Sequence, residues 1–163
     1  MPRSIRPTQS VVKEAIFNIV AAKIDGATVV DLFAGSGALG IEALSRGAMH
    51  VTFVDREPRG LDILRQNLDA LGFKQRARVV RAEVARWLEG GPDEMRQAGV
   101  VFLDPPYDDP VLDRSLKALD RLAGPLTVVA EYSRRQSLPA LERLQLVRER
   151  RYGDTMVAVL EAE

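Results

Sequence analysis

A glycine-rich loop is the first feature of this sequence that could bind a ligand. Residues 35–40 (GSGALG) fit the pattern G-x-G-x-x-G, and Asp55 follows Gly35 by 20 residues. In nucleotide-binding α/β proteins, an acid at that spacing accepts hydrogen bonds from ribose hydroxyls. The carboxylate of Asp31, four residues before the first glycine, would repel the pyrophosphate of a dinucleotide but attract the sulfonium and ammonium groups of S-adenosylmethionine. The loop therefore favours S-adenosylmethionine over NAD.

The sequence Asp104-Pro105-Pro106-Tyr107 is a second candidate site, at the end of an apolar stretch that predicts a buried strand. Because proline has no N–H group and fixes φ, carbonyls near the two prolines stay free to accept hydrogen bonds from a ligand. The tyrosine ring can stack on a planar base. Together these groups suit an exocyclic amine on a heterocycle. A simple strand-ending turn is the alternative, but Asp104 repeats the strand-end position of Asp31 and Asp55, which favours a ligand site.

Helices and strands alternate along the chain, and this order predicts a parallel α/β sheet with helices on both faces. Apolar periodicity and turn residues predict helices over about 8–23 (with Thr8 as its cap), 38–46, 58–72, around Trp87, about 111–123 and near 137–143. Short apolar runs predict strands at 27–33, 50–54, 78–81, 100–103 and 126–131, and a hairpin of 146–152 and 156–160 around Gly153–Asp154. Ligands of such sheets lie beyond the carboxyl ends of the strands, where Asp31, Asp55, Glu83 and Asp104 fall.

Composition limits the classes of protein that this chain can belong to. It has 163 residues, with 23 basic and 23 acidic side chains, one histidine and no cysteine, and this length supports one domain over 1–163. The missing cysteines exclude a disulfide scaffold, a thiolate nucleophile and cysteine-ligated metals, and His50 alone provides no histidine-rich metal site. No apolar stretch approaches the ~20 residues that cross a bilayer, and the first residues do not resemble a signal peptide. We therefore expect a cytoplasmic protein without a metal.

Arginine makes up 19 of the 23 basic residues, and its side chain suits phosphate forks and base stacking. Two arginine-rich stretches, 76–86 and 134–151, are candidates for docking RNA, although solvated helix faces would explain them equally well. Three other conspicuous side chains are predicted to be structural. His50 opens a strand away from every motif, whereas Trp87 and Phe17 occupy apolar helix faces.

Several longer stretches accompany the two candidate sites. They are DLFAGSGALGIEALSRGA at 31–48, FVDR at 53–56, YGDT at 152–155 and the early R-P-T-x-x-x-V-K-E-A-I-F-N at 6–18. Together with D-P-P-Y they resemble the bacterial RsmD family over about residues 6–160. The glycine loop and D-P-P-Y occur in many amino-methyltransferases, whereas their combination with R-P-T and Y-G-D-T is much more specific.

The resemblance implies a class I methyltransferase that transfers a methyl group from S-adenosylmethionine to guanine N2 in 16S ribosomal RNA. It implies a Rossmann-like α/β fold: a seven-stranded, mostly parallel sheet with a C-terminal antiparallel hairpin, a cofactor half at about 28–90 and a target-amine half at about 99–160. Its implied partner is ribosomal RNA or a small-subunit assembly particle. The sequence favours a monomer but leaves the oligomeric state open. Site residues follow by position: Asp31, Gly35 and Gly37 for the methionine side, Asp55 for the ribose, Arg56, Glu83 and Val84 for the adenine, and Asp104, Pro105, Pro106 and Tyr107 for the target amine.

Other functions remain open at this point. Within the methyltransferases, D-P-P-Y also serves adenine N6 and protein amides. An NAD(P)-dependent oxidoreductase would explain the glycines and Asp55 but would leave Asp104–Tyr107 without a role. A non-catalytic RNA-binding module would explain the arginines but needs no cofactor loop.

Overall fold

The structure is a computed structural model that describes residues 9–122 and 124–163. The R-P-T motif and the expected cap Thr8 lie outside these residues. The helices are α1 (Gln9–Ile24), α2 (Ala38–Ser45), α3 (Pro58–Ala70), α4 (Val84–Glu89) and α5 (Val111–Leu122), with short 3₁₀ turns at Lys74–Arg76 and Asp93–Arg96. The strands are β1 (Thr28–Leu32), β2 (His50–Asp55), β3 (Ala77–Arg81), β4 (Val100–Leu103), β5 (Leu126–Ser133), β6 (Gln145–Tyr152) and β7 (Thr155–Ala162).

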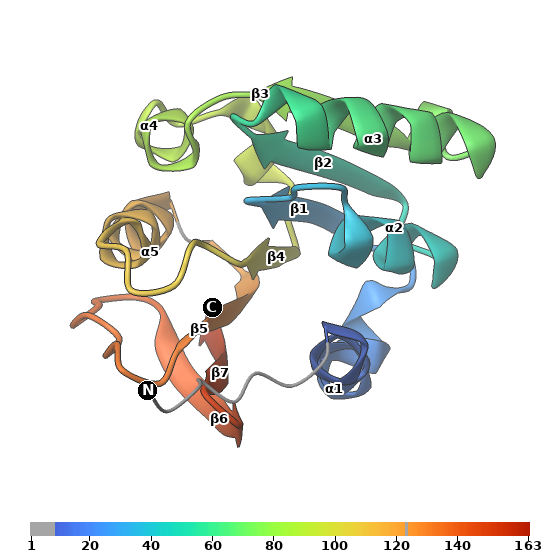
Figure 1. Ribbon diagram of the computed structural model, residues 1–163. Helices are drawn as coiled ribbons and strands as arrows, with labels where there is room; N and C mark the ends of the chain where they lie inside the picture. The colour runs from blue at the N-terminus through green and yellow to red at the C-terminus, as the bar shows by residue number, and fades with distance from the viewer. Residues whose placement is uncertain (1–8, 123) are drawn as a thin grey trace.

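The described strands form one seven-stranded sheet in the order β3-β2-β1-β4-β5-β7-β6 (Figure 1). The strands from β3 to β5 are parallel, while β7 pairs antiparallel with both β5 and β6. This arrangement confirms the expected mostly parallel sheet and its C-terminal antiparallel hairpin. The strand order reverses between β1 and β4, and ligands of open α/β sheets bind beyond the strand ends at such a point.

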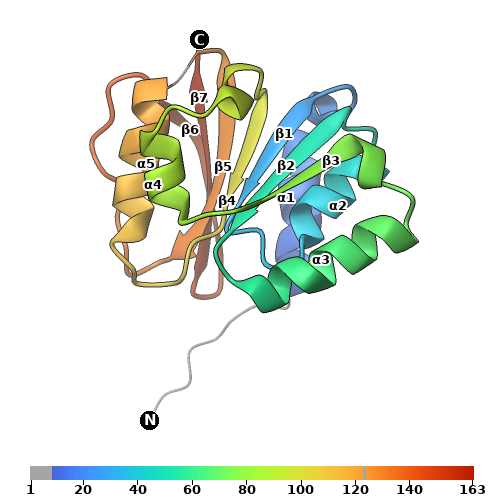
Figure 2. The ribbon, with the colours of Figure 1, turned by 90° about the horizontal axis from the view of Figure 1, so that it is seen from above.

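Helices cover both faces of the sheet, as expected: α1, α2 and α3 lie on one face, and α4 and α5 lie on the other (Figure 2). Side chains alternate along each strand, so each strand contributes to two cores. On β1, Val29 packs with the α1–α3 layer, whereas Val30 and Leu32 pack with α4 and α5. Asp31 therefore points to the α1–α3 face, where an apolar side chain would otherwise fill the core.

Most of the expected elements are confirmed within one or two residues of their bounds, and Pro58 begins α3 at the first helical position. Phe17 is fully buried against the Phe102 ring, with ring centroids 5.5 Å apart, and Trp87 packs against the core beneath α4 and α5. Both aromatics are structural, as predicted. His50 is the first residue of β2, at the edge of the sheet opposite the strand ends that carry the motifs.

The expected helix near 137–143 is wrong. The chain there is irregular, and the side chain of Asp120 on α5 accepts hydrogen bonds of 2.8 Å from the backbone N–H groups of Glu142, Arg143 and Leu144. These three N–H groups are bound to α5 and are not available for a helix of their own. β5 also extends further than expected, to Ser133.

Candidate active site

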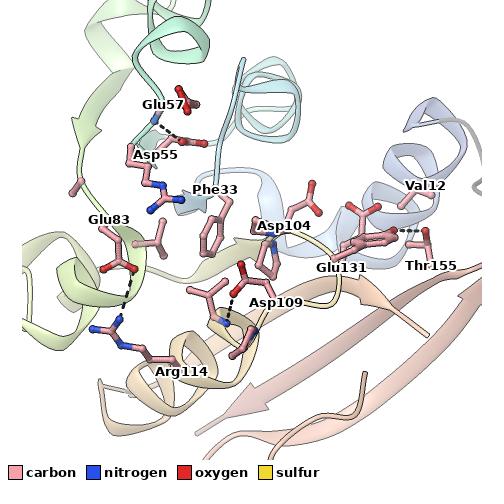
Figure 3. Close-up of a pocket in the computed structure, with 18 residues that line it drawn as sticks. Val12, Phe33, Asp55, Glu57, Glu83, Asp104, Asp109, Arg114, Glu131 and Thr155 are labelled. Carbon is pink, nitrogen blue, oxygen red and sulfur yellow. Dashed lines mark hydrogen bonds and ion pairs between the residues drawn. The ribbon is translucent and has the colours of Figure 1, made fainter. Parts of the chain in front are cut away.

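Two adjoining cavities open at the carboxyl edge of the parallel strands, with volumes of about 850 and 410 Å³. The larger lies beyond β2, β3, β4 and β5, and the smaller lies between the glycine loop and the first turns of α1. Their linings share four residues, which are Val12, Phe33, Asp104 and Glu131. Figure 3 shows Phe33 between the Asp55 side and the Asp104 side of the larger cavity. The two cavities together match the size and position of a ligand site in this class of sheet.

Asp31 forms the buried acidic wall of the smaller cavity. Its side chain is only 2% exposed, and its Oδ2 accepts a hydrogen bond from the N–H of Gly40 at 3.0 Å. Burial raises the pKa of Asp31 to about 7; the Gly40 hydrogen bond opposes this shift, and the negative charge of Asp55 adds to it. A buried carboxylate with one hydrogen bond and raised pKa is a site for a cation, because a positive charge would favour its ionised form.

Asp55 ties the glycine loop to the end of β2. Its Oδ2 accepts a hydrogen bond from the Gly35 N–H at 2.8 Å, and its Oδ1 accepts one from the Glu57 N–H at 2.9 Å. Gly35 has φ +55°, and a Cβ there would meet no atom within 4 Å, so its backbone faces open space. Since a carboxylate offers about four acceptor positions, Asp55 keeps capacity for ligand hydroxyls while it holds the loop.

Gly37 has a structural role that differs from that of Gly35. It lines neither cavity, and it has φ +86°. A Cβ at Gly37 would lie 2.3 Å from Leu64 Cδ1 of α3. Gly37 therefore lets the loop turn into α2 while α3 packs against it.

Glu83 and Val84, at the start of α4, line the larger cavity together with Arg56. Glu83 Oε2 accepts the Arg86 N–H at 3.0 Å and so caps α4. Arg114 of α5 donates from Nε to Glu89 Oε2 at 2.8 Å and also places its Nη1 3.9 Å from Glu83 Oε1 (Figure 3). The carboxylate of Glu83 is thus held by its own helix and by α5.

Asp104, directly after β4, and Glu131, near the end of β5, form a pair of acids on neighbouring strands. Register pairs Leu103 of β4 with Ala130 of β5, so the residues that follow them lie side by side. Burial raises the pKa of Asp104 well above its usual range, and the charge and hydrogen bond of Glu131 raise it further, with a smaller effect of Asp31. Asp104 is therefore harder to ionise than an ordinary aspartate, because it is buried and lies beside a second acid.

The loop that begins with D-P-P-Y is anchored to the start of β7 and to the residues just after β5. The Tyr107 hydroxyl hydrogen-bonds the Oγ1 of Thr155, the first residue of β7. Asp108, with φ +59°, donates its N–H to Gln136 Oε1 at 3.1 Å, and its carboxylate pairs with Arg135 at 2.7 Å. These contacts fix the tyrosine ring at the cavity wall, where the ring can cover a flat ligand.

The structure brings ten of the eleven expected site residues to the cavities. Those that line the larger one are Asp55, Arg56, Glu83, Val84, Asp104, Pro105, Pro106 and Tyr107, and those that line the smaller one are Asp31, Gly35 and again Asp104. Sequence reasoning missed Phe33, Arg114, Glu131 and Thr155, which also line them. A signal for Glu131 was present, because it is the last residue of the predicted apolar strand 126–131, close to the strand-end position that Asp104 occupies.

The two arginine-rich stretches lie in different settings. Arg76 donates to the carbonyl oxygens of Leu44 and Ala48 at 2.9 and 2.5 Å, so it holds the end of α2 at the opposite edge of the sheet. Arg134 pairs with Asp154 at 2.8 Å, directly after β5 and beside the cavity mouth. Arg76 is therefore structural, whereas the segment with Arg134 and Arg135 borders the site.

Neither a metal-binding cluster nor a membrane-spanning helix is present among the described residues. Across residues 9–122 and 124–163, no three or more histidine, cysteine, aspartate or glutamate side chains are grouped so as to hold a metal ion. Over the same residues, the helices are too short or too polar to cross a bilayer.

Comparison with known proteins assigns the chain to a family. The family model described as "Conserved hypothetical protein 95" matches residues 1–161. "Putative rRNA methyltransferase YlbH" of Bacillus subtilis is 40% identical over 160 residues, which are 96% of this chain and 87% of that protein. "Ribosomal RNA small subunit methyltransferase D" of Escherichia coli is 37% identical over 118 residues, 71% of this chain and 57% of that protein. The chain thus matches little more than half of the length of the latter.

Solved structures agree with the family match. "Putative methyltransferase yhhF" from Escherichia coli superposes with a TM-score of 0.86 at 31% identity, covering 100% of this chain and 91% of that chain. An RNA methyltransferase from Salinibacter ruber in complex with S-adenosyl-L-homocysteine shares the fold, with a TM-score of 0.73 at 17% identity over 97% of this chain and 95% of that chain. The fold is thus that of the S-adenosylmethionine-dependent methyltransferases, and the chain belongs to the conserved hypothetical protein 95 family, whose members are RsmD-like.

Proposed function

We propose that this protein methylates the exocyclic N2 amine of a guanine in small-subunit ribosomal RNA, with S-adenosylmethionine as the methyl donor. The observation that carries the proposal is the shared wall of the two cavities, in which Asp104 of D-P-P-Y lies between the glycine loop and Tyr107. One residue thus borders both a cation-attracting pocket and a pocket with a fixed aromatic ring. The relatives named as methyltransferases of ribosomal RNA support the RNA as the substrate class.

The residues of the cofactor side fit S-adenosylmethionine, which supplies a methyl group on a positively charged sulfur. Asp31 is a buried carboxylate that a positive charge would stabilise, and this matches the ammonium and sulfonium groups of the cofactor. Asp55 has acceptor capacity for ribose hydroxyls beside the open face of Gly35. Glu83 and Val84 border the place for the adenine. NAD fits poorly, because its pyrophosphate would face the acids.

On the target side, Asp104 raises the reactivity of the amine. The lone pair of guanine N2 is delocalised into the ring, so the free amine is a poor nucleophile. Asp104 and the Pro105 carbonyl accept hydrogen bonds from N2–H and orient the lone pair, and Tyr107 stacks on the extruded base. N2 would become positive as it accepts the methyl group, whose bond to the cofactor sulfur breaks to leave a neutral thioether. The Asp104 carboxylate would stabilise the charge on N2 and take the N2 proton.

Labelled methyl transfer tests this proposal. Small-subunit particles from cells that lack the protein are incubated with the purified chain and labelled S-adenosylmethionine, and the RNA is then digested and analysed by mass spectrometry. We expect the label in N2-methylguanosine at one nucleotide, and none with Asp104→Ala, which should still bind the cofactor. Label in adenine or in a ribosomal protein would point to the other amine substrates. Absence of transfer, with RNA binding retained, would favour a binding module.

A further inference from the structure

We propose that Glu131 selects the target base, by accepting a hydrogen bond from the ring N1–H of guanine while Asp104 holds the adjacent N2 amine. This inference rests on the proposed function, because it assumes that a guanine enters the larger cavity. It assigns base recognition to a strand-end acid outside D-P-P-Y and outside the glycine loop.

The placement of Glu131 supports this role. Along β5, the alternate residues Val129 and Glu131 point to the same face of the sheet, and Val129 belongs to the core beneath α1–α3. Asp104 follows Phe102 on that same face. Both acids line both cavities, and Figure 3 shows them at the wall between the cofactor side and Thr155. They are therefore neighbours that open onto the same space.

The order of the strands assigns one acid to each nitrogen of the base. Going from β1 to β4 to β5, the carboxyl edge passes from the glycine loop to Asp104 and then to Glu131. Adjacent strands are about 4.8 Å apart, so Glu131 lies roughly that much farther from the methyl donor than Asp104 does. The amine that receives the methyl group must be nearest to the donor. Asp104 is thus placed to bind the N2 amine, and Glu131 is placed to bind the neighbouring ring N1–H.

The chemistry of the pair matches guanine rather than adenine. Guanine presents two adjacent donors on this edge, the ring N1–H and the N2 amine, whereas adenine presents a donor amine beside a ring nitrogen with a lone pair. Two neighbouring ionised carboxylates can only accept, so they match both guanine donors, but in adenine one of them would face a lone pair. Repulsion between the Glu131 carboxylate and the ring lone pair of adenine would therefore add to the preference for guanine that its hydrogen bonds already provide.

Two further observations suit this assignment. Burial raises the pKa of Asp104, and the charge and hydrogen bond of the neighbouring Glu131 raise it further; N–H groups donated by a base would favour the ionised form of both acids. Tyr107 is tied by its hydroxyl to Thr155 on β7, the strand next to β5, and both Tyr107 and Glu131 line the larger cavity. The base can thus be stacked by the ring while its edge meets the acids.

A substrate that keeps the N2 amine and lacks N1–H tests the inference. After the methylated nucleotide has been mapped, small-subunit particles are reconstituted with either guanine or 2,6-diaminopurine at that position. The natural chain should prefer guanine by about 10- to 100-fold in kcat/KM, the effect of one hydrogen bond to a charged group. Glu131→Gln should methylate guanine more slowly and lose or reverse the preference, because its amide N–H can donate to the N1 of diaminopurine. S-Adenosylmethionine affinity should remain within about threefold, a difference of roughly 0.7 kcal/mol.

Glu57→Gln is the matched control. Glu57 also lines the larger cavity, near Asp55 and away from Glu131 (Figure 3), and the substitution removes the same charge. Whatever it does to the rate, it should leave the ratio of guanine to diaminopurine unchanged. A changed ratio would mean that the total negative charge of the cavity, and not Glu131, selects the base.

Three other outcomes would overturn the inference. The natural chain could methylate both bases equally, which needs no variant and so does not depend on whether Glu131→Gln folds. Glu131→Gln could keep the full preference for guanine. It could also lose cofactor affinity with an unchanged ratio, which would place Glu131 on the methionine side. If the natural chain labels no guanine at all, the proposed function itself fails, and this result is distinct from the other three.

Discussion

Asp31→Asn should stabilise the protein at alkaline pH. The side chain of Asp31 is 2% exposed, and its pKa is raised from 3.8 to about 7. Because the folded-state pKa lies above the unfolded one, the folded chain holds more protons between these two values, and the free energy of unfolding falls as pH rises. Between about pH 5 and about pH 8, ionisation of this carboxyl group should lower the free energy of unfolding by roughly 2–3 kcal/mol. The slope is about 1.36 kcal/mol per pH unit up to the folded-state pKa. Asparagine has no such charge and retains an oxygen to accept the Gly40 N–H.

Urea unfolding at about pH 5, 6, 7 and 8, without cofactor, measures the effect. The difference in unfolding free energy between Asp31→Asn and the natural chain should increase with pH and level off above about pH 7, where Asp31 is ionised. The Asp31 charge also raises the pKa of Asp104, so its removal should ease the ionisation of Asp104 and add to the gain. Asp62→Asn is a suitable control, because Asp62 is an exposed acid on α3.

Asp31→Asn should also weaken the binding of S-adenosylmethionine, because the buried carboxylate that lowers stability is the one proposed to attract the positive charges of the cofactor. Calorimetric affinity should fall by about tenfold or more, as expected for loss of a charge-assisted hydrogen bond. Stability curves of the two proteins that run parallel from about pH 5 to about pH 8 would refute the reasoning. They would mean that the raised pKa of Asp31 does not exist in the folded protein.

Other variants test separate parts of the site. Asp104→Ala should lower the single-turnover methylation rate by about 10²–10³, with cofactor affinity nearly unchanged in calorimetry. Asp55→Ala should weaken cofactor binding by about 1.5–3 kcal/mol, and unchanged affinity in a folded variant would remove Asp55 from the ribose site. Tyr107→Phe and Thr155→Val should each slow methylation, and the double variant should be no slower than the slower single one, because both break the same hydrogen bond. Arg135→Gln should reduce the slope of RNA affinity against salt by about one between about 50 and 200 mM, and an unchanged slope would exclude a phosphate contact.

Local signals were sufficient to predict much of the fold from the sequence. β4 has the expected bounds because Gly99 precedes it and Pro105 ends it, and α3 begins at Pro58 as its fixed φ favours. The positions of the residues predicted to bind the cofactor were also accessible to sequence reasoning, because they follow a spacing along the chain, and all of them except Gly37 line the cavities. Asp31 and Asp55 lie at the ends of strands that an apolar pattern identifies.

Contacts between distant segments were not predictable in this way. The helix expected near 137–143 does not form because Asp120, about twenty residues earlier, binds its N–H groups. Arg114 reaches Glu83 because α4 and α5 pack on the same face of the sheet. Arg76 belongs to an arginine-rich stretch, yet its direction is set by the carbonyl groups at the end of α2. In each case the partner is fixed by the tertiary structure, which the local pattern does not contain.

The antiparallel end of the sheet is part of the active site for a topological reason. In a parallel sheet, only the last residue of each strand meets the ligand edge. β7 runs opposite to β5, so its first residue, Thr155, lies at that edge beside Ser133. The turn at Tyr152–Thr155 thereby reaches the D-P-P-Y loop, where Thr155 binds Tyr107 and Asp154 pairs with Arg134. A further parallel strand would have put that turn at the opposite edge, far from Tyr107, so the reversal of β7 is what joins the two motifs in one site.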